Sequence, residues 1–240
     1  MLKQSFNKAV LREQFFPGLL GILLNPFYFA RKGLARHIRH FSGHITGKVL
    51  DIGCGAKPYE KIFADAKRYI GLEVKRSMPG ANRPDICYDG TVFPFKDAQF
   101  DSIVIFEVLE HVFGPERFLK EACRVLKTNG HVLVTVPFVW DEHEQPYDYC
   151  RYSSFGLKDI LTRCGFEIIE SRKSVNDASA VFQLWNMYIY KTFFTGSRFV
   201  NAVLSVFLIA PVNLVGSLLA ALLPGNDDLY LDNIVLAKKR

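Results

Sequence analysis

A glycine turn follows the first apolar run of the chain, and its residue types suit the binding of a ligand. The run and the turn read Val49-Leu50-Asp51-Ile52-Gly53-Cys54-Gly55-Ala56-Lys57-Pro58. Glycines at 53 and 55 permit a tight backbone and the close approach of a ligand to a helix that we expect just after the turn. Pro58 stands where the dinucleotide-binding fingerprint needs its third glycine, and Asp51 would repel a pyrophosphate. A cationic ligand would suit Asp51 better.

Further acidic residues lie near the ends of later apolar segments. Glu73 ends the segment Tyr69-Ile70-Gly71-Leu72-Glu73, and Asp89-Gly90 comes shortly before Phe93-Pro94-Phe95. Glu107 follows the apolar run 102–106 and precedes Leu109-Glu110-His111-Val112. In order and spacing, these segments and the glycine turn resemble the class I S-adenosylmethionine-dependent methyltransferases. The resemblance covers about residues 45–172 and the last predicted strand.

This resemblance implies a fold, a cofactor and an activity. The fold is a Rossmann-like α/β fold with a seven-stranded, mostly parallel sheet and helices on both faces, and the activity is methyl transfer from S-adenosyl-L-methionine. The implied cofactor-binding residues are Asp51, Gly53, Cys54, Gly55, Glu73, Asp89, Gly90 and Glu107. Among them, Glu73 would pair with the ribose and Asp89 with the adenine. Glu110 and His111 would open the next helix, so we expect them to be structural.

A second polar cluster follows the fifth predicted strand, at the edge of a parallel sheet where ligands bind. It reads Trp140-Asp141-Glu142-His143-Glu144-Gln145-Pro146-Tyr147-Asp148-Tyr149-Cys150-Arg151-Tyr152-Ser153, similar to a bacterial branch of these methyltransferases associated with cell-envelope saccharides or lipids. An oxygen acceptor needs a base within reach, and the candidates are His143 and then Asp148. Tyr149, Arg151 and Tyr152 are candidate acceptor-binding residues. Alternatively, Asp148 and Arg151 form an ion pair that fixes the loop.

The elements that must position these residues alternate between apolar runs and helical patterns, which is typical of a covered parallel sheet. The pattern predicts strands at 48–52, 69–74, 85–88, 102–106, 131–136, 166–171 and 230–237. It predicts one helix at 115–126, closed by Asn129-Gly130. A second helix is capped by Ser153 or Ser154 and ends near Cys164. We therefore divide the chain into an N-terminal segment 1–44, a core 45–175, an apolar insertion 176–229 and a last strand 230–240.

The positive charge of the chain is concentrated at its N-terminus. Residues 1–48 hold eight basic residues and one acid, or +7, of a total of +6. A basic segment beside apolar sequence favours an anionic membrane surface, and we expect no nucleic-acid partner. The five cysteines form no C-x-x-C pair, and His143, Glu142 and Glu144 lack the spacing of a known ligand set, so no metal site is expected.

The insertion contains residues 199–223, a stretch of 25 without a charge. Pro211 divides it into halves of about 18 Å each, too short for a bilayer core of about 30 Å. We therefore expect a helical hairpin that dips into the membrane interface or covers the active site. The prediction is a peripheral or monotopic methyltransferase on the cytoplasmic membrane face, with a hydrophobic, lipid-linked or cell-envelope acceptor.

Two alternatives stay open. The first is a soluble methyltransferase of a small molecule, with the insertion as a lid or as the contact of a homodimer. The second is a membrane-bound adaptor that keeps the fold and has lost transfer. The intact set of acids argues against the adaptor.

Overall fold

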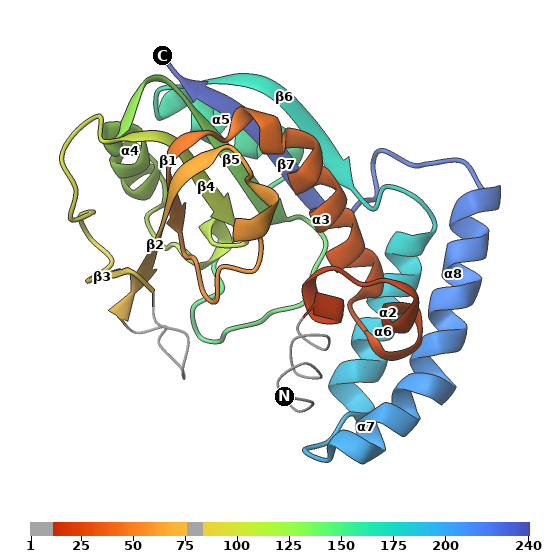
Figure 1. Cartoon of the computed structure of the whole chain (residues 1–240). Coiled ribbons are helices and arrows are strands. Elements are labelled where there is room, and N and C mark those ends of the chain that lie inside the picture. The colour runs from red at the N-terminus through yellow and green to blue at the C-terminus, as the bar shows by residue number, and fades with distance from the viewer. Residues whose placement is uncertain (1–11, 76–83) are drawn as a thin grey trace. The chain divides into compact units, whose positions relative to one another are not determined.

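The computed structural model describes residues 12–75 and 84–240 and divides into two compact units. The helical unit contains the described residues up to Arg36, together with Val139–Asp141 and Lys173–Asp232. The α/β unit contains His37–Phe138, Glu142–Arg172 and Asn233–Arg240 (Figure 1). Most of the N-terminal segment and the apolar insertion, which are far apart in the sequence, therefore belong to one unit.

A seven-stranded sheet forms the centre of the α/β fold, as the sequence predicts. Its strands are β1 (Gly47–Ile52), β2 (Ala66–Val74), β3 (Ile86–Tyr88), β4 (Phe100–Phe106), β5 (Leu126–Pro137), β6 (Phe166–Ser174) and β7 (Asp232–Lys239). They lie in the order β3-β2-β1-β4-β5-β7-β6. β1 pairs in parallel with β2 and β4, and the pairs β2–β3 and β4–β5 are also parallel. The carboxyl ends of these strands therefore meet at one edge, which is where the sheet can hold a ligand.

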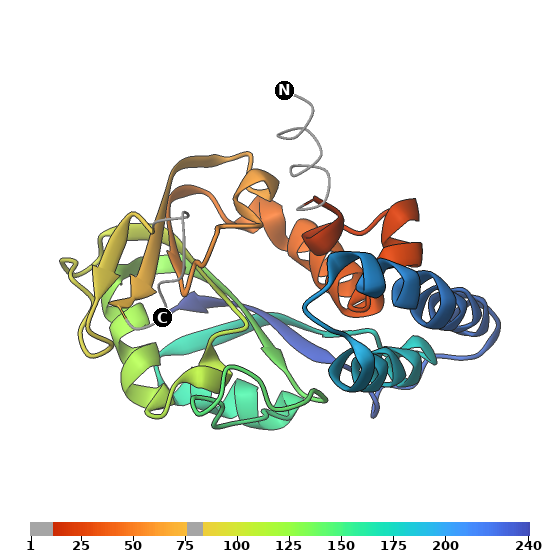
Figure 2. The same cartoon turned by 90° about the horizontal axis from the view of Figure 1, so that it is seen from below.

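The sheet is buried on both faces, which explains why its strands are nearly continuous apolar runs. Val49, Leu50 and Ile52 of β1 are all buried. Helices α4 (Pro115–Val125) and α5 (Ser154–Arg163) cover one face, and the last turn of α3 (Tyr28–Phe41) lies on the other (Figure 2). Ser153 caps α5, because its hydroxyl accepts a hydrogen bond from the backbone N–H of Gly156 at 3.2 Å. Short 3-10 turns at Ser42–His44 and Leu109–His111 complete the unit.

Two local expectations were wrong. The glycine turn is followed by turns and a short 3-10 helix, Glu60–Ile62, because the connection from Ile52 to Ala66 must hold both the turn and the return to the sheet. The helix predicted to end at 126 ends at Val125, and β5 begins at once. Asn129 adopts a positive φ of 61° inside that strand rather than closing the helix.

The helical unit corrects the expected hairpin. Its helices are α2 (Leu19–Leu24), the first part of α3, α6 (Ser179–Phe193), α7 (Arg198–Leu204) and α8 (Ala210–Leu222). A π-helical stretch, Ser205–Ile209, joins α7 to α8. Arg198–Leu222 is thus one continuous helix, and Pro211 follows the π-helical stretch, where the regular α-helical hydrogen bonding is already interrupted. The reversal of chain direction lies between α6 and α7 instead.

Buried amides hold the helical unit together. Gln183 of α6 accepts the backbone N–H groups of Phe29 and Ala30 and donates to the carbonyl of Pro26 at 2.8 Å. Asn213 of α8 donates to the carbonyl of Ile22 and accepts from Asn186 of α6, each at 2.8 Å. Because all three amides are fully buried, they fix the register of α6 and α8 against the N-terminal helices.

Candidate active site

A cavity of about 720 Å³ lies in the α/β unit, and it is lined by most of the predicted cofactor residues and, of the predicted acceptor-side residues, by Tyr149. A volume of this size is typical of a small-molecule site. Its lining includes the predicted cofactor residues Gly53, Gly55, Glu73, Asp89, Gly90 and Glu107. It also includes His111, Glu144, Tyr147 and Tyr149 from the acceptor side. The structure therefore places residues from four strand ends and from the polar loop around one space.

The two glycines of the turn have different roles. Gly53 has a φ of +72°, and a Cβ there would lie 2.3 Å from Cγ2 of Val108. Gly55 has a φ of +47°, but a Cβ there would meet nothing within 4 Å. Gly53 is thus required by the packing of the protein itself, whereas Gly55 borders open space that a ligand can enter.

Glu73 links the second strand to the turn. Its Oε2 atom accepts the backbone N–H of Gly55 at 3.0 Å, and its Oε1 atom accepts the N–H of Val74 at 2.9 Å. The side chain is only 9% exposed, yet it lines the cavity. The carboxylate is therefore held in one orientation beside Gly55.

Asp51 and Cys54 lie behind the cavity rather than in its wall. Asp51 is buried and accepts a hydrogen bond from the Tyr69 hydroxyl at 2.8 Å. Burial raises the pKa of Asp51 to about 7, and it raises the pKa of the Cys54 thiol to about 12. The Cys54 thiol is therefore not a nucleophile near neutral pH, and Asp51 is close to half-protonated there.

Asp89 and Glu107 stand at two further strand ends. Asp89 is held by Thr91, whose hydroxyl and N–H both donate to its Oδ1 atom, and these bonds lower its pKa. Glu107 has a positive φ of 54°, an unusual conformation for a residue with a side chain. The Thr135 hydroxyl donates to Glu107 Oε1 at 2.7 Å, and the Glu107 N–H donates to the Thr135 carbonyl. These bonds hold the residue at the cavity wall.

In the polar loop, residues 140–153, Asp148 accepts the hydrogen bonds that connect Arg151 to His143. Its carboxylate receives two hydrogen bonds from the Arg151 guanidinium, at 2.5 and 2.6 Å, and one from the His143 backbone N–H at 2.9 Å. Arg151 thereby holds the pKa of Asp148 at about 2. Arg151 is therefore engaged in the ion pair that was the alternative interpretation of this cluster. Tyr149 lines the cavity, whereas Tyr152 packs against the core.

His111 lies in the cavity wall, a position that the sequence pattern did not indicate. Its Nδ1 atom is 2.8 Å from the Tyr147 carbonyl oxygen, and its Nε2 atom is 3.1 Å from Nε2 of His143. His143 does not line the cavity itself, but its Nδ1 atom is 3.3 Å from Asp148. His111, Tyr147 and Glu144 are the site residues that sequence reasoning missed. The position of His111, four residues after Glu107, was the available signal.

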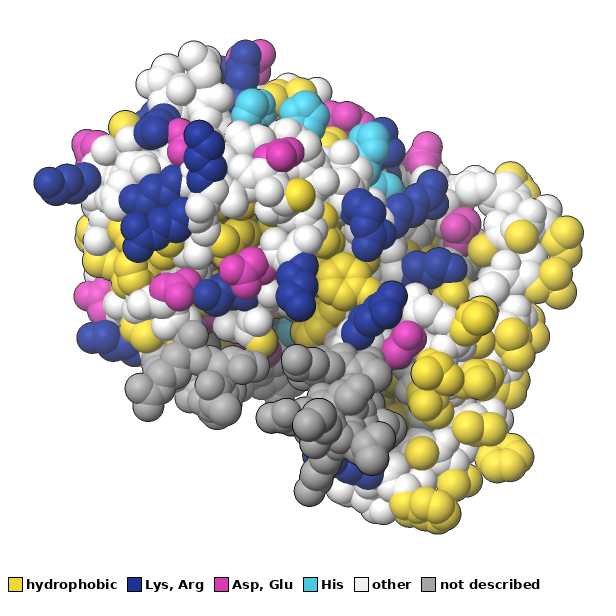
Figure 3. Space-filling model, viewed as in Figure 1, with side chains coloured by type: hydrophobic (Ala, Val, Ile, Leu, Met, Phe, Trp, Pro, Cys, Tyr) yellow, Lys and Arg dark blue, Asp and Glu magenta, His cyan; other side chains and the backbone are white. Residues whose placement is uncertain are grey.

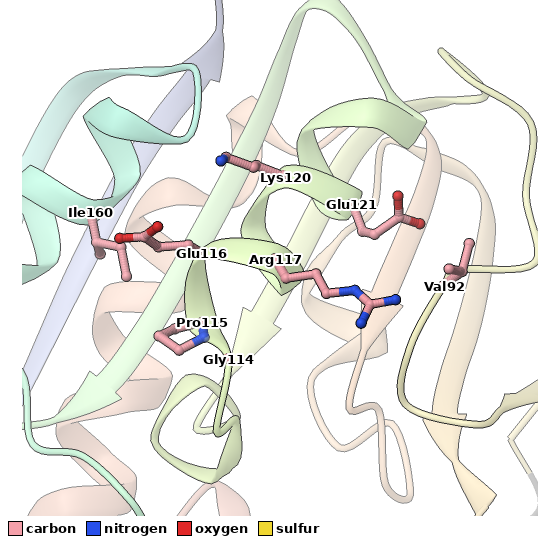
Figure 4. Close-up of a pocket in the computed structure, with 8 residues that line it drawn as sticks. All are labelled: Val92, Gly114, Pro115, Glu116, Arg117, Lys120, Glu121 and Ile160. Atoms are coloured by element: carbon pink, nitrogen blue, oxygen red, sulfur yellow. The ribbon is translucent and has the colours of Figure 1, made fainter.

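A second hollow lies at the start of α4 (Figure 4). Its two glutamates are already engaged, because Glu116 pairs with Arg163 and Glu121 pairs with Arg124. It contains none of the predicted site residues. We therefore assign the site to the first cavity.

Comparison with known proteins agrees with this geometry. Residues 50–134 match the family described as "Methyltransferase domain". A Mycolicibacterium smegmatis protein named "Probable S-adenosylmethionine-dependent methyltransferase" is 31% identical over 136 residues, 50% of this chain and 52% of that protein. A demethylmenaquinone methyltransferase of Renibacterium salmoninarum is 33% identical over 100 residues, 38% of this chain and 42% of that protein. The chain thus spans about half the length of these curated relatives.

The fold also matches a solved structure. A methyltransferase from Archaeoglobus fulgidus described as SAM dependent has a TM-score of 0.56 at 17% identity, covering 97% of this chain and 99% of that chain. The sheet order, the glycine turn and the acids at successive strand ends agree with the resemblance to the class I S-adenosylmethionine-dependent methyltransferases that the sequence shows. Because residues 50–134 match the methyltransferase domain family, the resemblance seen in the sequence is confirmed, together with the fold and the cofactor class.

Proposed function

We propose that this chain transfers a methyl group from S-adenosyl-L-methionine to a hydrophobic or lipid-linked acceptor. The observation that carries the proposal is the single cavity that gathers the cofactor residues and the acceptor loop. When bound, the cofactor supplies a methyl group already activated by its sulfonium. The protein then has to bind the acceptor, orient it toward the methyl group and exclude water.

The cofactor fits the residues at one end of the cavity. The open space beside Gly55 admits a ligand close to the backbone, and the fixed carboxylate of Glu73 is oriented to accept ribose hydroxyls. Asp89 lies on the next strand end and would accept from the adenine amino group. Asp51 supports the turn from below, and this differs from the direct contact that the resemblance implied.

The acceptor would enter at the other end, beside His111, Tyr147 and Tyr149. The aromatic rings offer an apolar surface, and Phe113, which is 84% exposed, packs edge-on against Tyr149. His143 and Asp148 lie behind His111 and orient it. We assign removal of the acceptor proton to this histidine cluster.

Membrane association is supported by the surface of the helical unit. Among the described residues, Arg198–Leu222 is the one helix long and apolar enough to cross a bilayer, and only 28% of its most apolar window is buried. Phe199, Phe207 and Leu218 are 78%, 72% and 60% exposed. Figure 3 shows hydrophobic side chains gathered over α8. A surface on which large apolar side chains are gathered in this way is typical of a contact with a partner or a membrane.

The connectivity favours a monotopic arrangement over a span. β6 and β7, which flank the helices in the sequence, are neighbours in one sheet. Both ends of the inserted segment must therefore lie on the same side of a bilayer. The basic N-terminal residues would add attraction to the anionic cytoplasmic leaflet, and the demethylmenaquinone methyltransferase relative is named for a quinone. Both observations support a hydrophobic acceptor on the cytoplasmic face.

Calorimetric titration with S-adenosylhomocysteine, with NAD as the control ligand, tests the cofactor assignment. We expect micromolar binding of the former alone. Glu73→Ala should weaken it at least tenfold, about 1.4 kcal/mol, whereas Glu167→Ala, an exposed glutamate on β6, should not. Failure of the folded protein to bind would contradict the proposal and favour the adaptor.

Sedimentation with vesicles of phosphatidylglycerol and phosphatidylethanolamine tests the membrane assignment. Replacing Phe199, Phe207 and Leu218 together by serine should release the protein from the vesicles. Phe155→Ser is the matched control, because Phe155 of α5 is equally exposed, at 81%, but lies on the α/β unit. Equal sedimentation of all three proteins would contradict this surface as the anchor. No sedimentation of the unmodified protein would favour the soluble enzyme with a lid or dimer contact.

A further inference from the structure

Three side chains that could bind a cation converge beside the cavity. Nε2 of His111 lies 3.1 Å from Nε2 of His143 and 3.7 Å from Oε1 of Glu110. One potential ligand atom from each residue lies within 4.8 Å of the others. Two histidines and one carboxylate are a common ligand set for divalent transition metals.

The hydrogen bonds on the outer side of each ring direct the lone pairs inward. Nδ1 of His111 faces the Tyr147 carbonyl, which can only accept, so this nitrogen carries the proton. Nδ1 of His143 lies 3.3 Å from Oδ2 of Asp148, an acceptor, so this nitrogen is the one positioned to donate. In their neutral forms, both rings therefore present a lone pair from Nε2, and the two lone pairs oppose each other at 3.1 Å. A positive centre at this position would remove that repulsion.

Glu110 contributes a buried carboxyl group whose two oxygens are available to a ligand. Its side chain is fully buried, and within the described ranges 12–75 and 84–240 neither of its carboxylate oxygens has a hydrogen-bond partner. A buried carboxylate without a donor is unfavourable. A bound cation would satisfy it.

We propose that Glu110, His111 and His143 bind one divalent transition-metal ion, such as Zn²⁺, Mn²⁺ or Fe²⁺. With metal–nitrogen bonds of about 2.1 Å, nitrogens 3.1 Å apart subtend an angle of about 95°, which a metal centre accommodates. The Tyr147 carbonyl and Asp148 are the outer partners that metal-binding histidines usually have. The fold, not the sequence spacing, makes this ligand set, which is why none was expected.

The protein backbone brings the loop to this position. The Glu110 carbonyl accepts the N–H groups of Tyr149 and Cys150, at 2.9 and 3.3 Å. These bonds tie the loop that contains His143 to the 3-10 turn that contains Glu110 and His111. The site is therefore formed before any ion binds.

The ion would act on the acceptor. Three protein ligands leave coordination positions open, and His111 lines the cavity, so an acceptor oxygen can complete the shell. The metal would then lower the pKa of that oxygen, so that its proton passes to solvent before methyl transfer; with the ion bound, the histidines would act as ligands, and without it they would act as the base. This consequence rests on the proposed methyl transfer, whereas the metal site itself does not.

The test is titration of the chelator-treated full chain with Co²⁺, followed by visible absorption, and with Zn²⁺, followed by calorimetry, both without cofactor. We expect one ion per chain. His143→Ala and Glu110→Gln should each weaken binding at least tenfold, and Asp148→Asn should weaken it tenfold to a hundredfold. His44→Ala is the matched control, because His44 and His131 form another histidine pair, with ring centroids 5.6 Å apart. It should leave binding unchanged.

Two results would overturn the proposal. One is the absence of stoichiometric binding, which would mean that the two histidines share a proton. The other is binding that the folded His143→Ala protein retains. If Glu110→Gln fails to fold, the more exposed His143 still decides the question. Binding of S-adenosylhomocysteine by the metal-free protein is measured separately, so failure of the metal site and failure of the proposed function are distinguishable.

Discussion

The carboxyl group of Asp51 is in an environment that disfavours its charge. It is buried under the glycine turn and has the Tyr69 hydroxyl as a donor, but Glu73 lies nearby and adds negative charge. Its pKa in the folded protein is about 7, whereas an unfolded aspartate has a value near 4. Folding therefore takes up a proton between these two values.

This shift predicts a pH dependence of stability. Because the folded state holds the proton more tightly, the free energy of unfolding falls as the pH rises from about 4 to 7. Above pH 7 Asp51 is ionised in both states, and the destabilisation by its buried charge is complete. Asp51→Asn keeps the hydrogen bond from Tyr69 and removes the cost. We expect the variant to be more stable than the original protein at pH 8, by up to about 4 kcal/mol, and equally stable below pH 4.

Urea unfolding at both pH values measures this difference. Asp65→Asn, at an exposed aspartate in the same connection, is the control and should change stability at neither pH. A constant difference between Asp51→Asn and the original protein at all pH values would contradict the raised pKa.

At the residue scale, the order of the motifs predicts one half of the site and not the other. Glu73 lies at the end of a strand, Asp89 and Glu107 each follow one, and parallel strands end at the same edge, so these residues could be placed from the sequence. The pairing of His111 with His143 depends on how the loop folds back over the 3-10 turn. No local pattern contains that information, because the contact is made by backbone bonds to Glu110.

At the element scale, one glycine of the turn is required for the stability of the fold and the other for the binding of the ligand. Gly53→Ala adds a Cβ against Val108 in a left-handed conformation, so we expect a loss of about 1–3 kcal/mol. Gly55→Ala adds a Cβ in open space, so stability should fall less, while affinity for S-adenosylhomocysteine falls more. Thermal unfolding and calorimetry on both variants measure the two effects.

A double substitution checks the cause. Val108→Ala should restore part of the stability that Gly53→Ala loses, because it removes the clash and leaves only the backbone strain. The absence of any coupling between the two positions would contradict the assigned contact.

The helices show where sequence patterns are insufficient. Pro211 indicated a break, because proline lacks an N–H and its ring clashes with the preceding turn. In the structure, the π-helical stretch before it absorbs the irregularity, and Asn213 two residues later is fixed by Ile22 and Asn186. Whether a proline ends a helix is thus decided by contacts from distant segments.

At the scale of the whole molecule, charge and apolar surface would act together on a membrane. The net charge of +7 in residues 1–48 would attract anionic lipid, and salt would screen this attraction. The exposed side chains of α8 contribute a term that salt does not weaken. Raising the salt concentration from 50 to 500 mM should therefore reduce vesicle sedimentation without abolishing it. Complete release would mean that attraction by charge alone holds the protein.

The position of β7 between β5 and β6 has a consequence for synthesis on the ribosome. The inserted helices are translated after β6 and before β7. Strands β1–β6 have therefore been synthesised while the position of β7, between β5 and β6, is still unfilled. The apolar side chains of α8 emerge during the same interval. A nascent chain would thus expose an incomplete sheet and an apolar helix together, and contact with a bilayer or a chaperone at that moment would protect both from aggregation.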